Sequence, residues 1–137
     1  MKIAVYTICK NESAFVDRWV DSMSEADGIY VLDTGSEDDT VEKLKKRGVV
    51  VDTAKIVPWR FDTARNMSLE LVPEDVDVCV CTDLDEVFLP GWRERIEKTW
   101  KKGDSQARFR YTWSFNEDGS EGVVFWEENI HARKGFR

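Results

Sequence analysis

The chain of 137 residues is 42% hydrophobic and 34% charged, which is typical of one globular domain that buries a core. Its 20 basic and 27 acidic residues give a formal net charge of −7, which argues against a nucleic-acid-binding protein, because such proteins normally carry a basic face. The sequence has no run of about 18 apolar residues that would predict a transmembrane helix, and its N-terminus lacks the layout of a signal peptide. Its three cysteines form no C-x-x-C pair, and Cys79 and Cys81, two apart on one strand face, are expected to be buried thiols rather than a disulfide or a zinc pair, so we expect a cytoplasmic protein.

Apolar runs and apolar stripes alternate along the first hundred residues. Short β-favouring runs predict buried strands at residues 2–9, 29–32, 49–51 and 78–82. Apolar residues at helical spacing predict helices between and after these strands, at residues 15–23, 36–47, 62–72 and 90–100. Ser36 followed by Asp39 has the spacing of a capping box, and Asp62 is the expected N-cap of the third helix.

The pattern changes to strict alternation after Gly103. Residues 107–115 and 123–126, with a turn at 116–119, predict a β-hairpin, and its aromatic residues are candidates for core packing or for stacking on a sugar. The whole order predicts an α/β fold, with a mainly parallel sheet, crossover helices and a C-terminal β-hairpin.

Polar clusters follow the first, second and fourth predicted strands: residues 10–12, 33–36 and 83–86. The carboxyl ends of parallel strands meet at one edge of the sheet, where α/β proteins bind their ligands. The third cluster contains Asp83, Asp85 and Glu86, which repel one another at such short spacing. A hard divalent cation such as Mg²⁺ or Mn²⁺ prefers oxygen ligands and would offset this repulsion. We therefore expect a nucleotide and metal site at this edge.

Four motifs in this order resemble the nucleotide-sugar-binding half of GT-A fold glycosyltransferases, in particular the inverting family 2. They occupy residues 10–12, 31–40, 64–66 and 83–86, and the resemblance covers about residues 2 to 100. It implies one GT-A-like domain over 1–137, with a Rossmann-like nucleotide-binding half at 1–100 and the start of an acceptor half at 104–137. Members of the family are usually longer, so we expect a truncated chain that binds a donor better than it transfers from it.

The resemblance implies a nucleotide-diphosphate sugar as donor, with a UDP-sugar expected. Asn11 and Glu12 would line the base and ribose, although Asn11 has a second interpretation as a cap of the first helix. Asp33 would accept hydrogen bonds from the base, or serve only as a turn residue. Arg65 would bind the diphosphate through paired, charge-assisted bonds, or form a surface salt bridge instead.

The resemblance also implies transfer of the sugar to an unknown acceptor with inversion, assisted by Mn²⁺ or Mg²⁺. Asp85 would ligate the cation directly, and Asp83 would contact the ribose or a metal-bound water. His131, the one histidine, is a candidate for a late metal ligand or an ordinary surface residue. Glu128 is the expected catalytic base, with Glu127 beside it as the other local candidate.

Three other functions fit parts of the sequence. A non-catalytic nucleotide-sugar-binding domain would share the binding residues and cannot be separated from the enzyme by them. A nucleotidyltransferase should carry a Gly-rich loop after the first strand, where this chain has residues 10–13 without glycine. An aspartic protease would explain residues 33–36, but such proteases are nearly all β, and helical patterns flank the motif here.

Overall fold

The computed structural model describes residues 1–112 and 114–134, apart from the side chains of Phe125 and Glu128. Its centre is a six-stranded sheet with the order β3-β2-β1-β4-β6-β5. The strands are β1 (Ile3–Cys9), β2 (Gly28–Asp33), β3 (Val50–Thr53), β4 (Val78–Cys81), β5 (Gln106–Thr112) and β6 (Val124–Ala132). The first four are parallel to one another, and β6 runs antiparallel to both β4 and β5.

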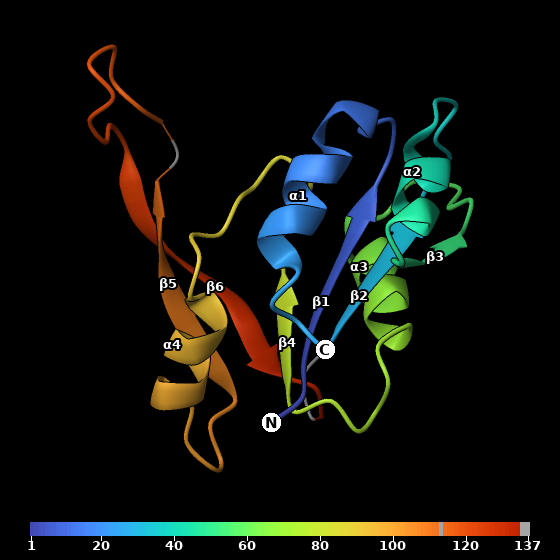
Figure 1. The fold of residues 1–137 in the computed structure, drawn as a ribbon. Coiled ribbons are helices and arrows are strands. Elements are labelled where there is room, and N and C mark those ends of the chain that lie inside the picture. The colour runs from blue at the N-terminus through green and yellow to red at the C-terminus, as the bar shows by residue number, and fades with distance from the viewer. Residues whose placement is uncertain (113, 135–137) are drawn as a thin grey trace.

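The helices cover both faces of this sheet (Figure 1). They are the 3₁₀ helix η1 (Ser13–Phe15), α1 (Val16–Met23), α2 (Thr40–Lys46), α3 (Phe61–Glu70) and α4 (Trp92–Thr99). Side chains from α1, α2 and α4 pack on one face against Ile3, Val5 and Val80. Leu69 of α3 packs on the other face against Ala4 and its neighbours. Because both of their faces are buried, the central strands β1 and β4 are mostly apolar rather than alternating, whereas the edge strand β3 is largely exposed. The predicted α/β architecture is confirmed.

Two predicted helix starts are wrong. Ser36 does not cap α2, which begins at Thr40, because its hydroxyl is bonded to the Asp33 carboxylate. Asp62 does not cap α3 either, since that helix begins at Phe61 and Asp62 pairs with the Arg60 side chain. Both segments therefore use their polar side chains to fix the preceding loop.

The hairpin is longer than predicted and belongs to the main sheet. Strand β6 continues to Ala132, and its last residues pair with β4 in the register Val80↔Ile130 and Val78↔Ala132. The distal half of the hairpin projects away from the helices (Figure 1). Phe115 and Trp126 are exposed there, whereas Tyr111 is partly buried; Trp113 lies outside the described residues. No helix among residues 1–112 and 114–134 is long and apolar enough to cross a membrane.

Candidate functional site

The site is built from the carboxyl ends of the parallel strands. Because β1, β2, β3 and β4 are parallel, the residues that follow them emerge at the same edge of the sheet. Short loops carry Lys10, Thr34 and Lys55 beyond the first three strands, and Asp83 and Asp85 beyond β4. The antiparallel register of β6 against β4 brings the N-terminal part of β6 to this edge as well.

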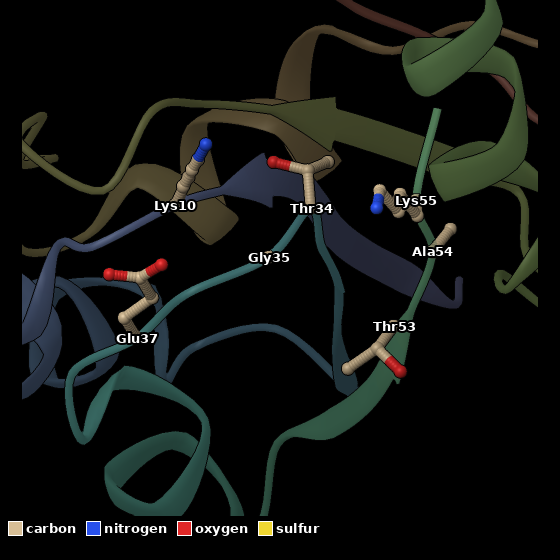
Figure 2. A pocket seen from close by; sticks show the side chains of 7 residues that line it. All are labelled: Lys10, Thr34, Gly35, Glu37, Thr53, Ala54 and Lys55. Carbon is tan, nitrogen blue, oxygen red and sulfur yellow. The ribbon is translucent and has the colours of Figure 1, made fainter. Parts of the chain in front are cut away.

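Two adjoining cavities lie beyond β1, β2 and β3, with volumes of about 460 and 430 Å³. Lys10, Thr34 and Lys55 line both of them. Figure 2 shows Lys10 and Lys55 on either side of Thr34. The first cavity is completed by residues 35 and 37 of the loop after β2 and by residues 53 and 54 at the end of β3. The second is completed by residues 56 and 57 and the indole of Trp59. An open cavity with two ammonium groups and an exposed aromatic ring can receive a planar, oxygen-bearing ring system.

The turn after β2 fixes how Thr34 faces these cavities. The Thr34 hydroxyl donates a 3.0 Å hydrogen bond to the Cys9 carbonyl, so its oxygen presents only lone pairs to a ligand. Asp33 is only 2% exposed. Its carboxylate accepts from the Gly35 and Ser36 amides at 3.1 and 2.9 Å, from the Ser36 hydroxyl, and from the Cys9 thiol at 3.4 Å. Asp33 therefore holds the turn that presents Thr34, and its contact with a base stays a prediction.

Asn11 also acts within the loops of this edge. Its backbone lies in the left-handed region with φ of 53°, and its side-chain oxygen accepts the Glu37 amide at 2.7 Å. Its own amide donates to the Ser36 hydroxyl at 2.8 Å. These bonds tie the loop after β1 to the loop after β2, so Asn11 is not a cap of η1, whose N-cap is Glu12. The predicted contact of Asn11 with the ribose stays a prediction.

The carboxylates of Glu12, Asp83 and Asp85 form a region of like charge. Partial burial and the charges of Asp85 and Asp83 raise the pKa of Glu12 to about 7. Burial of the carboxyl and the charge of Asp85 also raise the pKa of Asp83, although Arg65 opposes this effect. Among the residues that the structure describes, no three His, Cys, Asp or Glu side chains are grouped closely enough to hold a cation by themselves. A cation here would have to complete its coordination with oxygens of a ligand, as Mg²⁺ commonly does with phosphates.

Arg65 lies on α3 beside the Asp83 carboxylate. Its guanidinium sits over the Phe61 ring at 4.9 Å from the centroid, which orients the planar group. In the described part of the chain, Arg65 Nε is buried without a hydrogen-bond partner. A buried N–H donor without a partner costs free energy, and an anionic ligand would supply the missing acceptor. The structure is therefore compatible with the predicted role of Arg65 toward a diphosphate. Among the side chains that the structure describes, Arg65 forms no salt bridge, which was the alternative prediction.

His131 does not fit the predicted role of metal ligand. It is 2% exposed, on β6. Its Nδ1 lies 2.8 Å from the Ala132 carbonyl and its Nε2 lies 2.7 Å from the Tyr6 hydroxyl. Because Nδ1 must donate to the carbonyl, Nε2 accepts from the tyrosine, and both ring nitrogens are engaged. Burial lowers the pKa of this imidazole, which is consistent with a neutral structural histidine.

The two candidate bases lie on β6. Glu127 is partly buried, and its carboxylate accepts from the Asn129 side chain at 3.3 Å. The backbone of Glu128 belongs to β6, but its side chain lies outside the described part of the structure. The assignment of either residue as the base stays a prediction.

Three residues of the site were missed or left without a role in the sequence. Lys10 and Thr34 belong to the polar clusters described above, yet neither was given a contact with a ligand. Lys55 lies in the loop after β3, where no motif in the sequence indicates a ligand contact. Its position follows from the strand order, because β3 is the neighbour of β2 and its carboxyl end therefore lies beside the loop that carries Thr34.

A family model described as glycosyl transferase family 2 matches residues 4–135. The fold is similar to that of glucosyl-3-phosphoglycerate synthase from Mycobacterium tuberculosis in complex with uridine-diphosphate, with 24% identity and a TM-score of 0.62. Structures of that enzyme with Mn²⁺ and uridine-diphosphate-glucose, and with Mg²⁺ and uridine-diphosphate, both give 25% identity and a TM-score of 0.61. These three matches cover 77% of this chain and 42% of the synthase chain, so the chain spans about two fifths of the synthase.

A curated protein with a partial match is adenylosuccinate synthetase from Lachancea thermotolerans. It is 33% identical over 86 residues, which are 62% of this chain and 20% of that protein. The similarity is confined to one fifth of the synthetase, whereas the family model extends over nearly the whole chain and agrees with the solved structures in fold.

Proposed function

The chain belongs to glycosyl transferase family 2, and on that premise we propose that it is a metal-dependent glycosyltransferase domain. It takes a sugar from a nucleoside-diphosphate sugar and passes it to an acceptor hydroxyl with inversion at the anomeric carbon. The observation that carries the proposal is the meeting, at one sheet edge, of the cavities around Thr34 with Arg65 and the carboxylates of Asp83 and Asp85. In this proposal residues 1–100 hold the donor and residues 104–137 begin the acceptor side.

The base of the donor is proposed to be uracil. Lys10 and Lys55 offer N–H donors on either side of the Thr34 oxygen, which can only accept. The imide edge of uracil is the complement of this pattern, since a ring N–H lies between two carbonyl oxygens. Cytosine and adenine present an amino group where one lysine requires an acceptor. The synthase structures at 25% identity, which hold uridine-diphosphate or its glucose conjugate, support the same choice.

The diphosphate is proposed to extend from these cavities toward β4. Arg65 offers a planar guanidinium with an unpaired buried N–H, which suits paired bonds to phosphate oxygens. Asp85, with Asp83 beside it, would ligate Mn²⁺ or Mg²⁺, and Glu12 lies in the same like-charged region. This donor set fits a hard cation, because it consists of carboxylates whose repulsion a cation relieves. When bound, the cation would neutralise the charge that develops on the leaving phosphate oxygens.

The transfer step needs one base for the acceptor. As the bond between the anomeric carbon and the diphosphate oxygen breaks, its electron pair leaves with the diphosphate. The acceptor oxygen then bonds to the opposite face of the anomeric carbon and gives its proton to a carboxylate. Glu128 is our candidate for that carboxylate, and Glu127 is the alternative. The register Val80↔Ile130 supports this choice, because it brings the preceding residues of β6 toward the edge where Asp83 lies.

Proton NMR of UDP-glucose with the purified chain and Mn²⁺ tests this proposal. Water can serve as acceptor, so we expect slow release of UDP, with β-glucose appearing before mutarotation equilibrates the anomers. Glu128→Gln should slow this release while UDP still binds. Release of α-glucose would contradict inversion. Tight, Mn²⁺-dependent binding of UDP with no release from any UDP-sugar would favour a non-catalytic binding domain.

A further inference from the structure

The carboxylate turn, which we define as residues 82–86, is anchored on one side by α1. The Trp19 indole donates a 2.9 Å hydrogen bond to the Thr82 hydroxyl, and both residues are buried. The Arg18 guanidinium donates to the Asp85 carbonyl at 3.1 Å. These bonds fix the backbone of the turn and leave the Asp83 and Asp85 carboxylates for a ligand.

The carboxylate turn is closed on its other side through Glu86. The Glu86 carboxylate accepts from the Asp83 amide at 2.7 Å, while the Glu86 amide donates to the Asp83 carbonyl at 3.1 Å. The phenol of Tyr111, on β5, donates a further hydrogen bond to the same carboxylate. Glu86 is partly buried, and its acceptors are directed to these two donors. Its carboxylate is thus used inside the protein.

The segment after the carboxylate turn follows the same path between α1 and β5 (Figure 1). The Phe88 amide donates to the Ser22 hydroxyl of α1 at 3.3 Å. The Phe88 ring packs edge-on against Phe109 of β5, with 5.2 Å between the ring centroids. The hairpin strand is therefore in contact with the loop that carries the expected cation ligands.

We infer that Tyr111 is a positioning residue that holds the Glu86 carboxylate against the Asp83 amide and thereby presents Asp83 and Asp85 to the cation. The inference rests on the proposed function and adds two statements to it. Glu86 supports the cation site without being a ligand, and the β5–β6 hairpin is coupled to the donor site through one hydroxyl group.

Repulsion among the carboxylates explains why the hydroxyl matters. Glu86 lies beside Asp83 and Asp85, and their charges act on one another. Without the Tyr111 hydroxyl, the Glu86 carboxylate loses a donor and is less firmly held in its bond to the turn. The turn then samples open geometries, in which the ligand carboxylates are no longer preorganised. Loss of a hydrogen-bond partner that supports metal ligands typically weakens metal affinity by about 10–100-fold.

Tyr111→Phe tests the inference, with Tyr30→Phe as a matched loss of a hydroxyl on β2. Calorimetry should measure UDP binding in Mn²⁺ and in EDTA, and electron paramagnetic resonance should measure free Mn²⁺ in the presence of UDP. We expect Tyr111→Phe to weaken Mn²⁺ binding about tenfold and to leave UDP binding in EDTA unchanged. Tyr30→Phe should change neither. If Tyr111 were merely structural, loss of its hydroxyl would lower stability without altering the ratio of UDP affinity in Mn²⁺ to UDP affinity in EDTA.

Two variants of Glu86 test whether its carboxylate supports the carboxylate turn or ligates the cation directly. Glu86→Gln keeps an oxygen that accepts from the Asp83 amide and should retain nearly full Mn²⁺ affinity. Glu86→Ala removes that oxygen and should weaken Mn²⁺ binding, as Tyr111→Phe does. If Glu86→Gln abolished Mn²⁺ binding, Glu86 would be a ligand and the inference would be overturned. In the cation-free protein, hydrogen exchange at the Asp83 amide should be faster in Tyr111→Phe than in the wild type. Equal exchange and equal Mn²⁺ affinity would also overturn it.

The behaviour of the wild type distinguishes the two proposals. Wild-type chain that binds UDP no better with Mn²⁺ than in EDTA contradicts the proposed metal site, and the role of Tyr111 falls with it. If UDP binding by the wild type depends on Mn²⁺ and the Tyr111→Phe variant binds Mn²⁺ as tightly as the wild type, only the positioning role of Tyr111 is contradicted.

Discussion

The Tyr6 hydroxyl donates a 2.7 Å hydrogen bond to His131 Nε2, although the two residues are 125 positions apart in the chain. Their rings also meet edge-on, with 5.6 Å between centroids. Tyr6 lies on β1 and His131 on β6, two strands separated in the sheet by β4. The pair therefore joins the last described strand to the first across β4.

His131→Ala should destabilise the chain and leave cation binding intact. The substitution leaves the buried Tyr6 hydroxyl without its acceptor, which costs about 1–3 kcal/mol. Urea unfolding should show this loss, and Tyr6→Phe should cost less because it leaves no unpaired donor. Loss of Mn²⁺-dependent UDP binding at unchanged stability would restore His131 as a metal ligand.

The same histidine should make stability depend on pH. Burial lowers the pKa of His131 below its ordinary value of 6.5, so below pH 6.5 the unfolded chain binds a proton more readily than the folded chain. The contribution of the neutral His131 imidazole to stability is complete above pH 6.5 and decreases as the pH falls through that value. Urea unfolding of the wild type and of His131→Gln at several pH values measures the effect.

The contribution of Glu12 to stability has the opposite pH dependence and must be separated from that of His131. Its pKa rises from 4.5 to about 7 on folding, so its contribution decreases as the pH rises from 4.5 to 7. The difference in free energy of unfolding between the wild type and His131→Gln removes the Glu12 effect, which both proteins share. We expect this difference to shrink below pH 6.5, and a constant difference would contradict a depressed pKa of His131.

Lys55→Met should reduce the preference for uracil. The variant keeps the length of the side chain and removes the ammonium that is proposed to donate to a uracil carbonyl. We expect about tenfold weaker UDP binding, or about 1.4 kcal/mol, which is close to the value of a hydrogen bond to a charged group. CDP should be affected less, because cytosine has an amino group at that position. Lys46→Met, on α2, is the control, and an equal loss for UDP and CDP would indicate a phosphate contact instead.

Asp33→Asn should lower stability more than it alters base preference. The Asp33 carboxylate accepts from two amides, a hydroxyl and a thiol, and an asparagine would direct an NH₂ group at some of these donors. We expect a loss of about 2 kcal/mol in the free energy of unfolding, with Asp52→Asn as an exposed control. Unchanged stability combined with altered nucleotide preference would support a direct contact with the base.

The strands, the crossover helices and the family could be predicted because the signals are local. Periodicity identifies each element, and the rules for parallel connections then bring the polar loops to one edge. The prediction that Cys79 and Cys81 are buried thiols followed from their spacing on one strand, and both are buried and free. The positions of Asp83, Asp85 and Arg65 came from motifs that each occupy a few consecutive residues.

Other features depend on contacts between distant segments. The polar residues 127–129 and His131 do not suggest a strand, and only pairing with β4 shows that β6 continues to Ala132. Nothing near His131 in the sequence indicates that Tyr6 is its partner. Likewise, the importance of Lys55 follows from the order β3-β2-β1, and that of Tyr111 from the passage of residues 82–88 beside β5.

Calorimetric titration of UDP into the wild type and into Asp85→Asn, each in Mn²⁺ and in EDTA, tests the central claim most directly. The wild type should bind UDP in Mn²⁺ and lose most of its affinity in EDTA. At a free concentration one hundred times the Kd, UDP should raise the free energy of unfolding by about 2.7 kcal/mol. Asp85→Asn should bind UDP weakly in both buffers and should be at least as stable as the wild type without ligand, because carboxylate repulsion is relieved. Equal UDP affinity in Mn²⁺ and EDTA, or an Asp85→Asn variant that keeps its dependence on Mn²⁺, would contradict the proposed site.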